Sequence, residues 1–273
     1  MLDGLVSSWF VASLLGLALA PTASSPSSGR ALAARALLLS DADRLRALAA
    51  LPPSEREQFF RSLSVADLVA LGRKSLSCLG IYQARVTREE RVDGRLHGPD
   101  SVEVIVRESP RAVRLDFVSG THKGRRALYN AALRPKEMLA RESGVFGLVS
   151  LWLSLDNRLA RRYTNHNITE VGFGAMIDSM QADQAKAAEV GGYQRLDEGF
   201  DARGLYCMLF TAPPGANGLY ARRLRYCVDG ARGLPMRIEV FDDNGRREYV
   251  EYHDLRVRQA LGDADFTPGA AGL

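Results

Sequence analysis

The stretch from Gly233 to Pro268, GLPMRIEVFDDNGRREYVEYHDLRVRQALGDADFTP, decides the fold class of this chain. Apolar and polar side chains alternate on both sides of a short polar turn, which is the period of a β-strand with one buried face. The turn is Asp243-Asn244-Gly245, and these residue types tolerate the positive φ angles of a tight hairpin. The stretch therefore predicts two antiparallel strands and a closing apolar segment that ends near Phe266.

The end of this stretch also resembles a known group of proteins. The phrase that runs from Tyr252 through Asp254-Leu255 to Asp265-Phe266 is similar to the C-terminal end of the bacterial outer-membrane lipoprotein carrier superfamily. The resemblance implies a half-open antiparallel barrel that holds acyl chains in the cell envelope.

A long antiparallel meander is predicted upstream of the hairpin. Strand-like runs lie at 81–92, 101–107, 112–118, 126–133 and 137–141, with short turns rich in Gly, Pro and Asp between them. Short turns between consecutive strands indicate an antiparallel sheet. Alternation gives this sheet one apolar side, at positions such as Val104, Leu115 and Phe117, and that side needs a cover.

Two apolar segments are the predicted cover. The first is Val145 to Leu159, and the second is a helix near Ile168 to Val190, after which strands resume. We therefore expect an α+β fold: a curved antiparallel sheet, or half-open barrel, covered on its concave face by helices, with a helical segment at the N-terminus. Periodicity leaves open whether the covered space is a filled core or a cavity.

Four runs carry a second resemblance: YQARV (82–86), ERVDG (90–94), RESPRAV (107–113) and RYTNHNITEVG (162–172). They look like the bacterial domain-of-unknown-function family 1571, and the match extends from about Leu79 to Phe266. The chain carries His166-Asn167 where a His-Pro pair is expected in that family. The resemblance implies the fold and an envelope context, and it supplies no catalytic residue.

The N-terminus predicts export. An apolar run from Leu5 to Ala20 precedes a small and polar segment, which is the pattern of a secretory signal. An uncleaved anchor or a buried helix is the alternative, although the run is shorter than the roughly 20 residues that a spanning helix needs. We expect a periplasmic protein with the following parts: a signal peptide at 1–23, a linker and helical segment at 24–78, a carrier-like β domain at 79–268 and a tail at 269–273.

Helices are predicted between the signal and the sheet. Two capping-box patterns, Ser54 with Glu57 and Ser64 with Asp67, mark helix starts. The amphipathic stretch 31–51 mixes Asp and Arg on its polar face. This mixture favours docking on the core over binding to a membrane surface or to a partner helix.

The three cysteines lack the close spacing of metal or redox motifs. Strands predicted at 205–211 and 219–229 form a hairpin that brings Cys207 near Cys227. In an oxidising compartment this pair is a candidate cross-strand disulfide, and two small thiols in the core are the alternative. Cys78 lies at the end of a helical segment, where we expect it to be buried and inert.

Charge and motifs exclude several function classes. The chain has 36 Lys and Arg against 32 Asp and Glu without a basic stripe, which argues against nucleic-acid binding. The four histidines have no metal-ligand spacing such as HExxH, and no glycine loop for phosphate is present, so neither a metal nor a cofactor is expected.

We also expect no enzymatic activity. A hydrolytic site would combine His166 with Glu170 or Asp178 and a nucleophile such as Ser150 or Ser154. Neither serine lies in the glycine pattern of a nucleophile elbow.

The leading hypothesis is a periplasmic carrier-like protein that sequesters an acyl chain on the concave apolar face of the sheet. The predicted ligand-binding residues are Val104, Leu115, Phe117, Tyr129, Phe146, Leu151, Trp152, Met236 and Ile238. The expected partner is a lipid or an acylated protein, an envelope protein is a further candidate, and membrane contact is at most peripheral. The alternative is a non-enzymatic envelope interaction or sensing module with a filled core.

Overall fold

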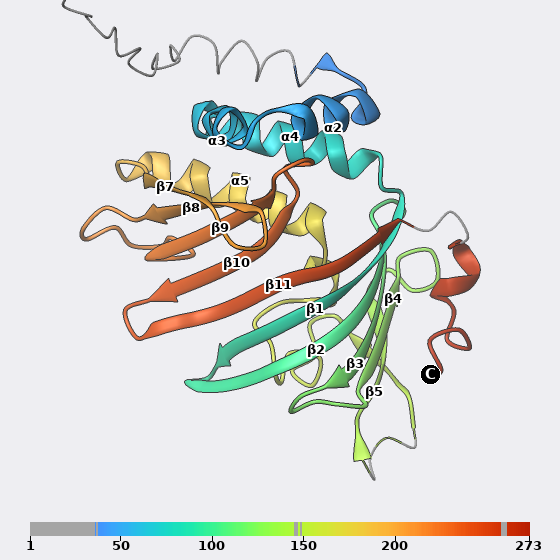
Figure 1. Cartoon of the computed structure of the whole chain (residues 1–273). Coiled ribbons are helices and arrows are strands. Elements are labelled where there is room, and N and C mark those ends of the chain that lie inside the picture. Colours follow the sequence, from blue (N-terminus) through green and yellow to red (C-terminus); the bar gives the residue numbers. More distant parts are fainter. Residues whose placement is uncertain (1–35, 37, 145–146, 148, 258–260) are drawn as a thin grey trace, which may run out of the picture.

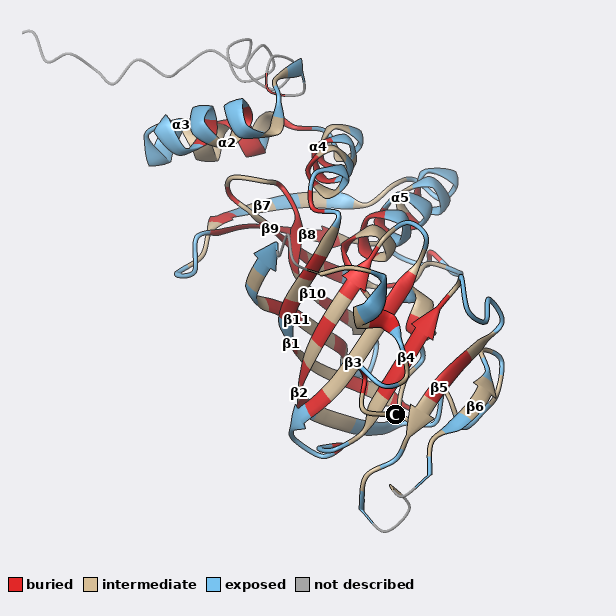
Figure 2. Cartoon of the chain, turned by 90° about the vertical axis from the view of Figure 1, so that its right-hand side faces the viewer, coloured by how far each residue is buried: buried red, intermediate tan, exposed pale blue. Residues whose placement is uncertain are grey.

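An open sheet of 11 strands forms the centre of the computed structural model, which describes residues 36, 38–144, 147, 149–257 and 261–273. The strand order is β6-β5-β4-β3-β2-β1-β11-β10-β9-β8-β7, and each neighbouring pair is antiparallel. Helices flank this curved sheet (Figures 1 and 2). The expected α+β class, with an antiparallel sheet and helical cover, is confirmed.

The strands of the first half of the chain follow sequence order from the middle of the sheet to one of its edges. Its strands are β1 (Ile81–Val92), β2 (Arg95–Arg107), β3 (Ala112–Ser119), β4 (Arg126–Asn130), β5 (Glu137–Arg141) and β6 (Leu151–Ser154). In β1 the side chains of Tyr82, Ala84 and Val86 are buried and alternate with more exposed ones, as a strand with one covered face requires.

The second half starts at the opposite edge and returns to the middle. Its strands are β7 (Gln194–Phe200), β8 (Leu205–Thr211), β9 (Arg223–Asp229), β10 (Pro235–Asp242) and β11 (Gly245–Val257). Strand β11 pairs with β1, with Val86 opposite Tyr252 and Glu90 opposite Glu248. The connection between the halves therefore runs from one edge of the sheet to the other.

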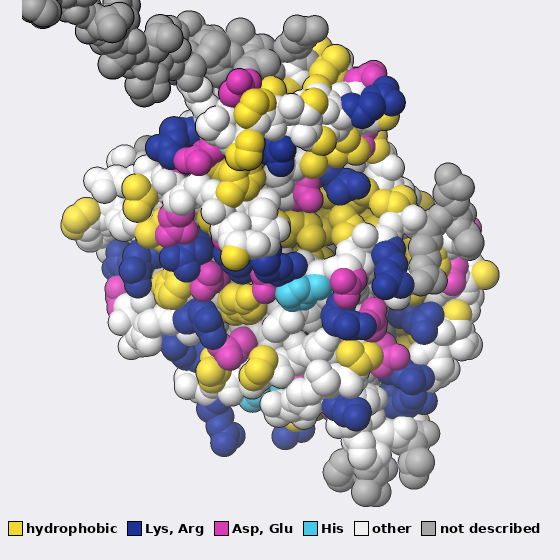
Figure 3. Space-filling model, in the orientation of Figure 1, with side chains coloured by type: hydrophobic (Ala, Val, Ile, Leu, Met, Phe, Trp, Pro, Cys, Tyr) yellow, Lys and Arg dark blue, Asp and Glu magenta, His cyan; other side chains and the backbone are white. Residues whose placement is uncertain are grey.

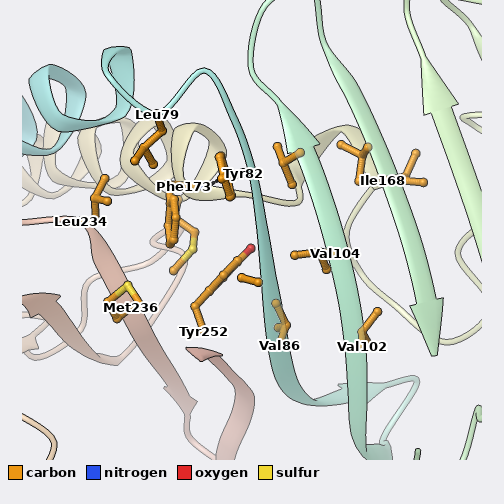
Figure 4. Packing of buried hydrophobic residues seen from close by; sticks show 14 of the residues in the cluster. Leu79, Tyr82, Val86, Val102, Val104, Ile168, Phe173, Leu234, Met236 and Tyr252 are labelled. Atoms are coloured by element: carbon orange, nitrogen blue, oxygen red, sulfur yellow. Dashed lines mark hydrogen bonds between the residues drawn. The ribbon is translucent and has the colours of Figure 1, made fainter. Parts of the chain in front are cut away.

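This connection supplies the cover of the concave face. It contains the 3-10 turn η2 (Ile168–Glu170) and helix α5 (Phe173–Glu189), which confirms the helix predicted near 168–190. The α5 side chains that face inward are buried: Phe173, Met176, Ile177, Met180 and Ala187. Figure 4 shows Phe173 beside Tyr82 and Tyr252.

The prediction that 145–159 covers the concave face is wrong for 151–154, while Val145, Phe146 and Leu148 lie outside the described residues. Residues 151–154 form β6, which pairs with β5 at the edge of the sheet, with Leu139 opposite Trp152. The alternation of a strand then sends Trp152 and Leu153 to opposite faces. An apolar run this short does not distinguish a strand from a covering segment by its period alone.

The N-terminal helices are α2 (Asp41–Ala50), α3 (Pro53–Ser62) and α4 (Val65–Ser77). They pack in one hydrophobic cluster with side chains of β8, β9 and β10. Helix α4 approaches α5 at Gly72, where a Cβ would lie 3.0 Å from Cδ1 of Ile177. Among the helices of the described residues, none is long and apolar enough to span a membrane. The predicted signal peptide lies outside the described residues.

One of the two predicted capping boxes is confirmed. At α4 the Ser64 hydroxyl accepts from the Asp67 N–H at 3.1 Å, and Asp67 accepts from the Ser64 N–H at 3.0 Å. The predicted box of Ser54 with Glu57 is wrong, because α3 already begins at Pro53. A proline fits the first turn of a helix, where its missing N–H costs no hydrogen bond.

The C-terminal segment covers the opposite face of the sheet. Turn η3 (Asp263–Phe266) places the fully buried Phe266 against Leu128 and Leu139. The amide of Asn130 donates to the Phe266 carbonyl at 3.1 Å. Ala271 is buried in the same cluster, so part of the predicted tail packs on the sheet.

Cys207 and Cys227 lie opposite each other in β8 and β9 and are joined by a disulfide. The Arg237 guanidinium lies 3.3 Å from each sulfur. The expectation that Cys78 is buried is wrong: it is a free, exposed cysteine, because it is the C-cap residue of α4 and sits at the surface end of the helix.

Candidate functional site

A cavity of about 150 Å³ lies between the concave face of the sheet and α5. Strands from both halves of the chain and the helix contribute apolar side chains to its wall, among them Val86, Val104, Leu115, Met176, Ile238 and Val250. The question of a filled core or a cavity is therefore answered in favour of a cavity.

The N-terminus of α5 is tied to the sheet beside this cavity. The backbone N–H of Phe173 donates to the Tyr82 hydroxyl at 2.8 Å, and that hydroxyl donates to Glu108 Oε1 at 2.8 Å. Gly172 precedes the helix with a φ of +117°, and a Cβ there would lie 2.6 Å from the Tyr82 oxygen. Only glycine can adopt this φ angle and lie so close to Tyr82 without strain. Gly172 therefore fixes the point at which α5 begins.

Polar side chains form one cluster in the cavity wall, centred on His166. Its Nδ1 lies 2.8 Å from Glu170 Oε2, and its Nε2 lies 3.1 Å from Glu248 Oε2 and 3.0 Å from the Tyr220 hydroxyl. Tyr220 donates a hydrogen bond to Glu248. Glu90 faces Glu248 from the neighbouring strand.

Neighbouring groups hold Glu90 in place. Its Oε2 accepts from the Arg88 guanidinium at 2.7 Å, and its Oε1 accepts from the backbone N–H of Asn165. The same guanidinium donates to the Tyr163 carbonyl at 2.9 Å. Strand β1 is thereby linked to the segment that carries His166.

The hydrogen bonds within the cluster favour the charged forms of His166 and Glu248. Burial lowers the pKa of His166, but hydrogen bonds to Glu170 and Glu248 outweigh it and raise this pKa to about 10. Burial raises the pKa of Glu248, but the hydrogen bond and charge of His166 outweigh it, so the pKa lies below its ordinary value. Burial and Glu248 together raise the pKa of Tyr220 well above its usual range, so it remains a hydrogen-bond donor.

Glu90, His166 and Glu248 are also candidate metal ligands. One ligand atom from each lies within 4.8 Å of the others. These residues have no metal-ligand spacing in the sequence, because Glu90 belongs to β1, His166 to the connection before η2, and Glu248 to β11.

Four of the nine predicted ligand-binding residues line the cavity: Val104, Leu115, Phe117 and Ile238. Tyr129 and Met236 are buried in the hydrophobic core around it, and they are not among the described residues of the cavity wall.

The remaining three predictions fall on or near β6. Leu151 is 54% exposed, and Trp152 lies on the other face of the sheet, with Arg134 4.3 Å from its ring centre. Neither residue is among the described residues of the cavity wall, because β6 is an edge strand of the sheet. Phe146 lies outside the described residues.

The hydrolytic arrangement considered from the sequence is only partly assembled. His166 does contact Glu170, but Asp178 pairs with Arg73 at 2.7 Å. Ser150 and Ser154 are not among the described residues that line the cavity. The structure thus brings neither proposed nucleophile to the histidine.

Glu90, Tyr220 and Glu248 are site residues that were not predicted from the sequence. A signal for Glu90 existed in β1, because period two from Tyr82, Ala84 and Val86 places residue 90 on the same inward face. An acidic residue on an apolar face is a stronger indication of a site than one on a solvated face.

The family model described as "Protein of unknown function (DUF1571)" matches residues 80–271. The chain belongs to this family. The prediction from the four runs at 82–172 is thereby confirmed. The comparison with curated proteins gives no match.

Several solved structures are similar to this DUF1571 chain. An uncharacterized conserved protein from Thermus thermophilus has 13% identity and a TM-score of 0.44, over 75% of this chain and 93% of that one. A LolA superfamily protein from Nitrosomonas europaea has 13% identity and a TM-score of 0.35, over 76% and 99%. The Mycobacterium tuberculosis lipoprotein LppX has 15% identity and a TM-score of 0.40, over 73% and 99%.

Proposed function

We propose that this protein binds the acyl portion of a lipid or of a lipidated protein in the cavity under α5. The observation that carries the proposal is an apolar cavity with a polar cluster in its wall, which suits an amphipathic ligand. The cavity also favours this function over that of an interaction module with a filled core.

The size of the cavity limits how a ligand is held. A cavity of about 150 Å³ holds a group the size of benzene, or about six carbon atoms. At about 0.8 kcal/mol for each buried CH₂, such a group gains roughly 5 kcal/mol, which corresponds to an affinity near the millimolar range. A full acyl chain therefore needs further contacts, and α5 has to move away from the sheet to provide them.

The polar cluster then faces the head group of the ligand. Its three carboxylates, Glu90, Glu170 and Glu248, outnumber the two cationic groups beside them in the described cavity wall, Arg88 and His166. Repulsion by these carboxylates disfavours an anionic head group and favours a neutral or cationic one.

Binding of this kind is reversible burial without a covalent step, so the protein acts as a carrier or sequestering protein, not as an enzyme. The proposed place of action is the periplasm, reached through the signal peptide predicted at residues 1–23. The partner is a lipid or an acylated protein, and any membrane contact is peripheral.

The proposal is tested with a titration of the purified protein with an uncharged pyrene-labelled acylglycerol, followed by fluorescence. Leu115→Trp fills the cavity from β3, and we expect it to weaken probe binding by at least tenfold. Leu196→Trp is the matched control, because Leu196 lies on β7 and is 61% exposed. Absence of binding to the wild type, or equal binding by both variants, would contradict the proposal.

A further inference from the structure

Two acidic residues in the cavity wall face each other across adjacent strands. Glu90 in β1 lies opposite Glu248 in β11, and each is only 4% exposed. His166 reaches the same place from the connection before η2, with its Nε2 3.1 Å from Glu248 Oε2. We propose that Glu90, His166 and Glu248 bind a divalent transition-metal ion, with Zn²⁺ the best match.

An open ligand atom supports this site. Buried carboxylates are stable only when they are paired or coordinate a metal. Glu248 Oε1 is buried and accepts no hydrogen bond from any residue that the structure describes. Arg247 Nε is 3.8 Å from this oxygen, beyond hydrogen-bond distance. A metal ion at the cavity wall would satisfy this oxygen.

The orientation of His166 is a second, independent argument. A histidine that ligates a metal usually donates its other ring N–H to a carboxylate, which fixes the ring and its tautomer. Glu170 Oε2 occupies that position, 2.8 Å from Nδ1. The Nε2 atom points toward Glu248, and a bound ion would replace the proton that Nε2 shares with Glu248 in the metal-free protein.

The spacing of the ligand atoms suits a small ion. They lie within 4.8 Å of one another, and an ion about 2.0–2.2 Å from each would hold them within about 4.4 Å. Small side-chain rotations close this difference. Glu90 keeps its present hydrogen bonds, because a carboxylate has about four acceptor positions and only two are used.

The donor set and the charge decide the class of metal. Imidazole nitrogen suits Zn²⁺ and its neighbours, whereas Mg²⁺ and Ca²⁺ prefer all-oxygen sites. The cavity wall carries the carboxylates of Glu90, Glu170, Asp183 and Glu248 against one arginine, Arg88. A divalent cation offsets this excess of negative charge.

The test is calorimetric titration of the chelator-treated, tag-free full chain with ZnCl₂, and then with MgCl₂ and CaCl₂. The protein carries Cys78→Ser in every case, because the exposed Cys78 thiol is itself a zinc ligand. We expect one equivalent of Zn²⁺ to bind, with no competition from the two hard cations.

Four variants locate the site. Glu248→Gln and His166→Ala should each weaken Zn²⁺ binding by more than about 100-fold, and Glu170→Gln, which touches only Nδ1, by about 10–100-fold. His253→Ala is the control, because His253 lies 3.6 Å from Glu251 and the part of the chain that the structure describes offers this pair no third ligand. No Zn²⁺ uptake by the wild type, or unchanged affinity in Glu248→Gln and His166→Ala, would overturn the proposal.

X-ray absorption at the zinc edge of the Cys78→Ser protein needs no binding-site variant and remains informative if the variants fail to fold. One imidazole nitrogen with carboxylate oxygens would support the site, and a shell with several imidazoles would overturn it. Both measurements use the metal alone, so their outcome is separate from that of the acylglycerol titration.

Discussion

The ring of Tyr82 stacks on the ring of Phe173, with 4.8 Å between centroids and 21° between planes, while its hydroxyl accepts the Phe173 N–H. Tyr82 is in the central strand β1, and Phe173 is the first residue of α5. One side chain therefore packs against the cover of the cavity and also caps its helix.

Replacing Tyr82 with Phe should loosen this end of the cover. The variant keeps the ring and removes the hydroxyl, which leaves the Phe173 N–H without its acceptor. Glu108 loses one donor and keeps its contacts with the Gly174 N–H and the Arg111 guanidinium. We expect a loss of about 1–2 kcal/mol in unfolding free energy, as for other lost helix caps. Urea unfolding gives this value, and hydrogen exchange should show faster exchange of the Phe173 amide. An unchanged urea midpoint together with unchanged exchange would refute this role.

The disulfide should stabilise the fold mainly by lowering the conformational entropy of the unfolded chain. The double variant Cys207→Ala with Cys227→Ala opens a link between residues 20 positions apart, and we expect a loss of about 2–4 kcal/mol. Cys78→Ser is the control and should unfold like the wild type, because Cys78 is exposed and free. Thermal unfolding compares the three proteins, and equal stability of all three would contradict the expectation.

The face of the sheet away from α5 carries a network of ion pairs. Arg203 and Arg237 both contact Glu251, whose side chain is 8% exposed, and Arg225 contacts Glu198 and Glu239. Figure 3 shows basic and acidic side chains interspersed over the sheet face seen in Figure 1. Because Glu251 belongs to this network, the free energy of unfolding should depend on whether its carboxyl group is protonated.

The direction of this pH dependence follows from the pKa of Glu251. Burial raises this pKa, but the hydrogen bond from Tyr249 and the charges of Arg203, His253 and Arg237 outweigh it, so the pKa in the folded state lies below 4.5. A lowered carboxyl pKa stabilises the folded state above the unfolded value and loses this effect as the pH falls through the folded value.

Glu251→Gln should therefore be about 1.5–3 kcal/mol less stable than the wild type at pH 7. The difference should shrink as the pH falls through the lowered pKa of folded Glu251, where the wild-type carboxyl becomes protonated. Urea unfolding at a series of pH values measures it. Glu103→Gln is the control, because the Arg85 side chain of that pair is 51% exposed and such pairs contribute at most about 1 kcal/mol. A difference independent of pH would contradict the assignment.

The C-terminal segment should be part of the folded unit. Phe266 is fully buried, with the Arg107 guanidinium 5.0 Å from its ring centre. Phe266→Ala should lower the unfolding free energy by about 3–5 kcal/mol, the usual cost of truncating a buried Phe. Leu133→Ala, at a position 51% exposed, should have little effect. A Phe266→Ala protein as stable as this control would show that the segment does not hold the sheet.

Much of the fold could be predicted because strand period and turn residues agree locally. β1, β5 and β8 have the predicted ends, at 81–92, 137–141 and 205–211. β6 was missed because Leu151-Trp152-Leu153 is apolar throughout, so it gives no alternation from which to assign a face.

The candidate site could be predicted only in part, because its parts meet through long-range pairing. Val104, Leu115 and Ile238 follow from alternation along their own strands. Glu90 lies opposite Glu248 because β1 pairs with β11. His166 lies beside these two residues because of the path of the connection that leads to α5. No local pattern encodes either relationship.

Native mass spectrometry of the full chain purified from an exporting host would show whether the cavity under α5 holds an acyl chain. We expect a lipid adduct on the wild-type protein and on Leu196→Trp, and its loss in Leu115→Trp. Wild-type protein that carries no lipid and takes up none from added acylglycerol would refute acyl-chain binding in this cavity.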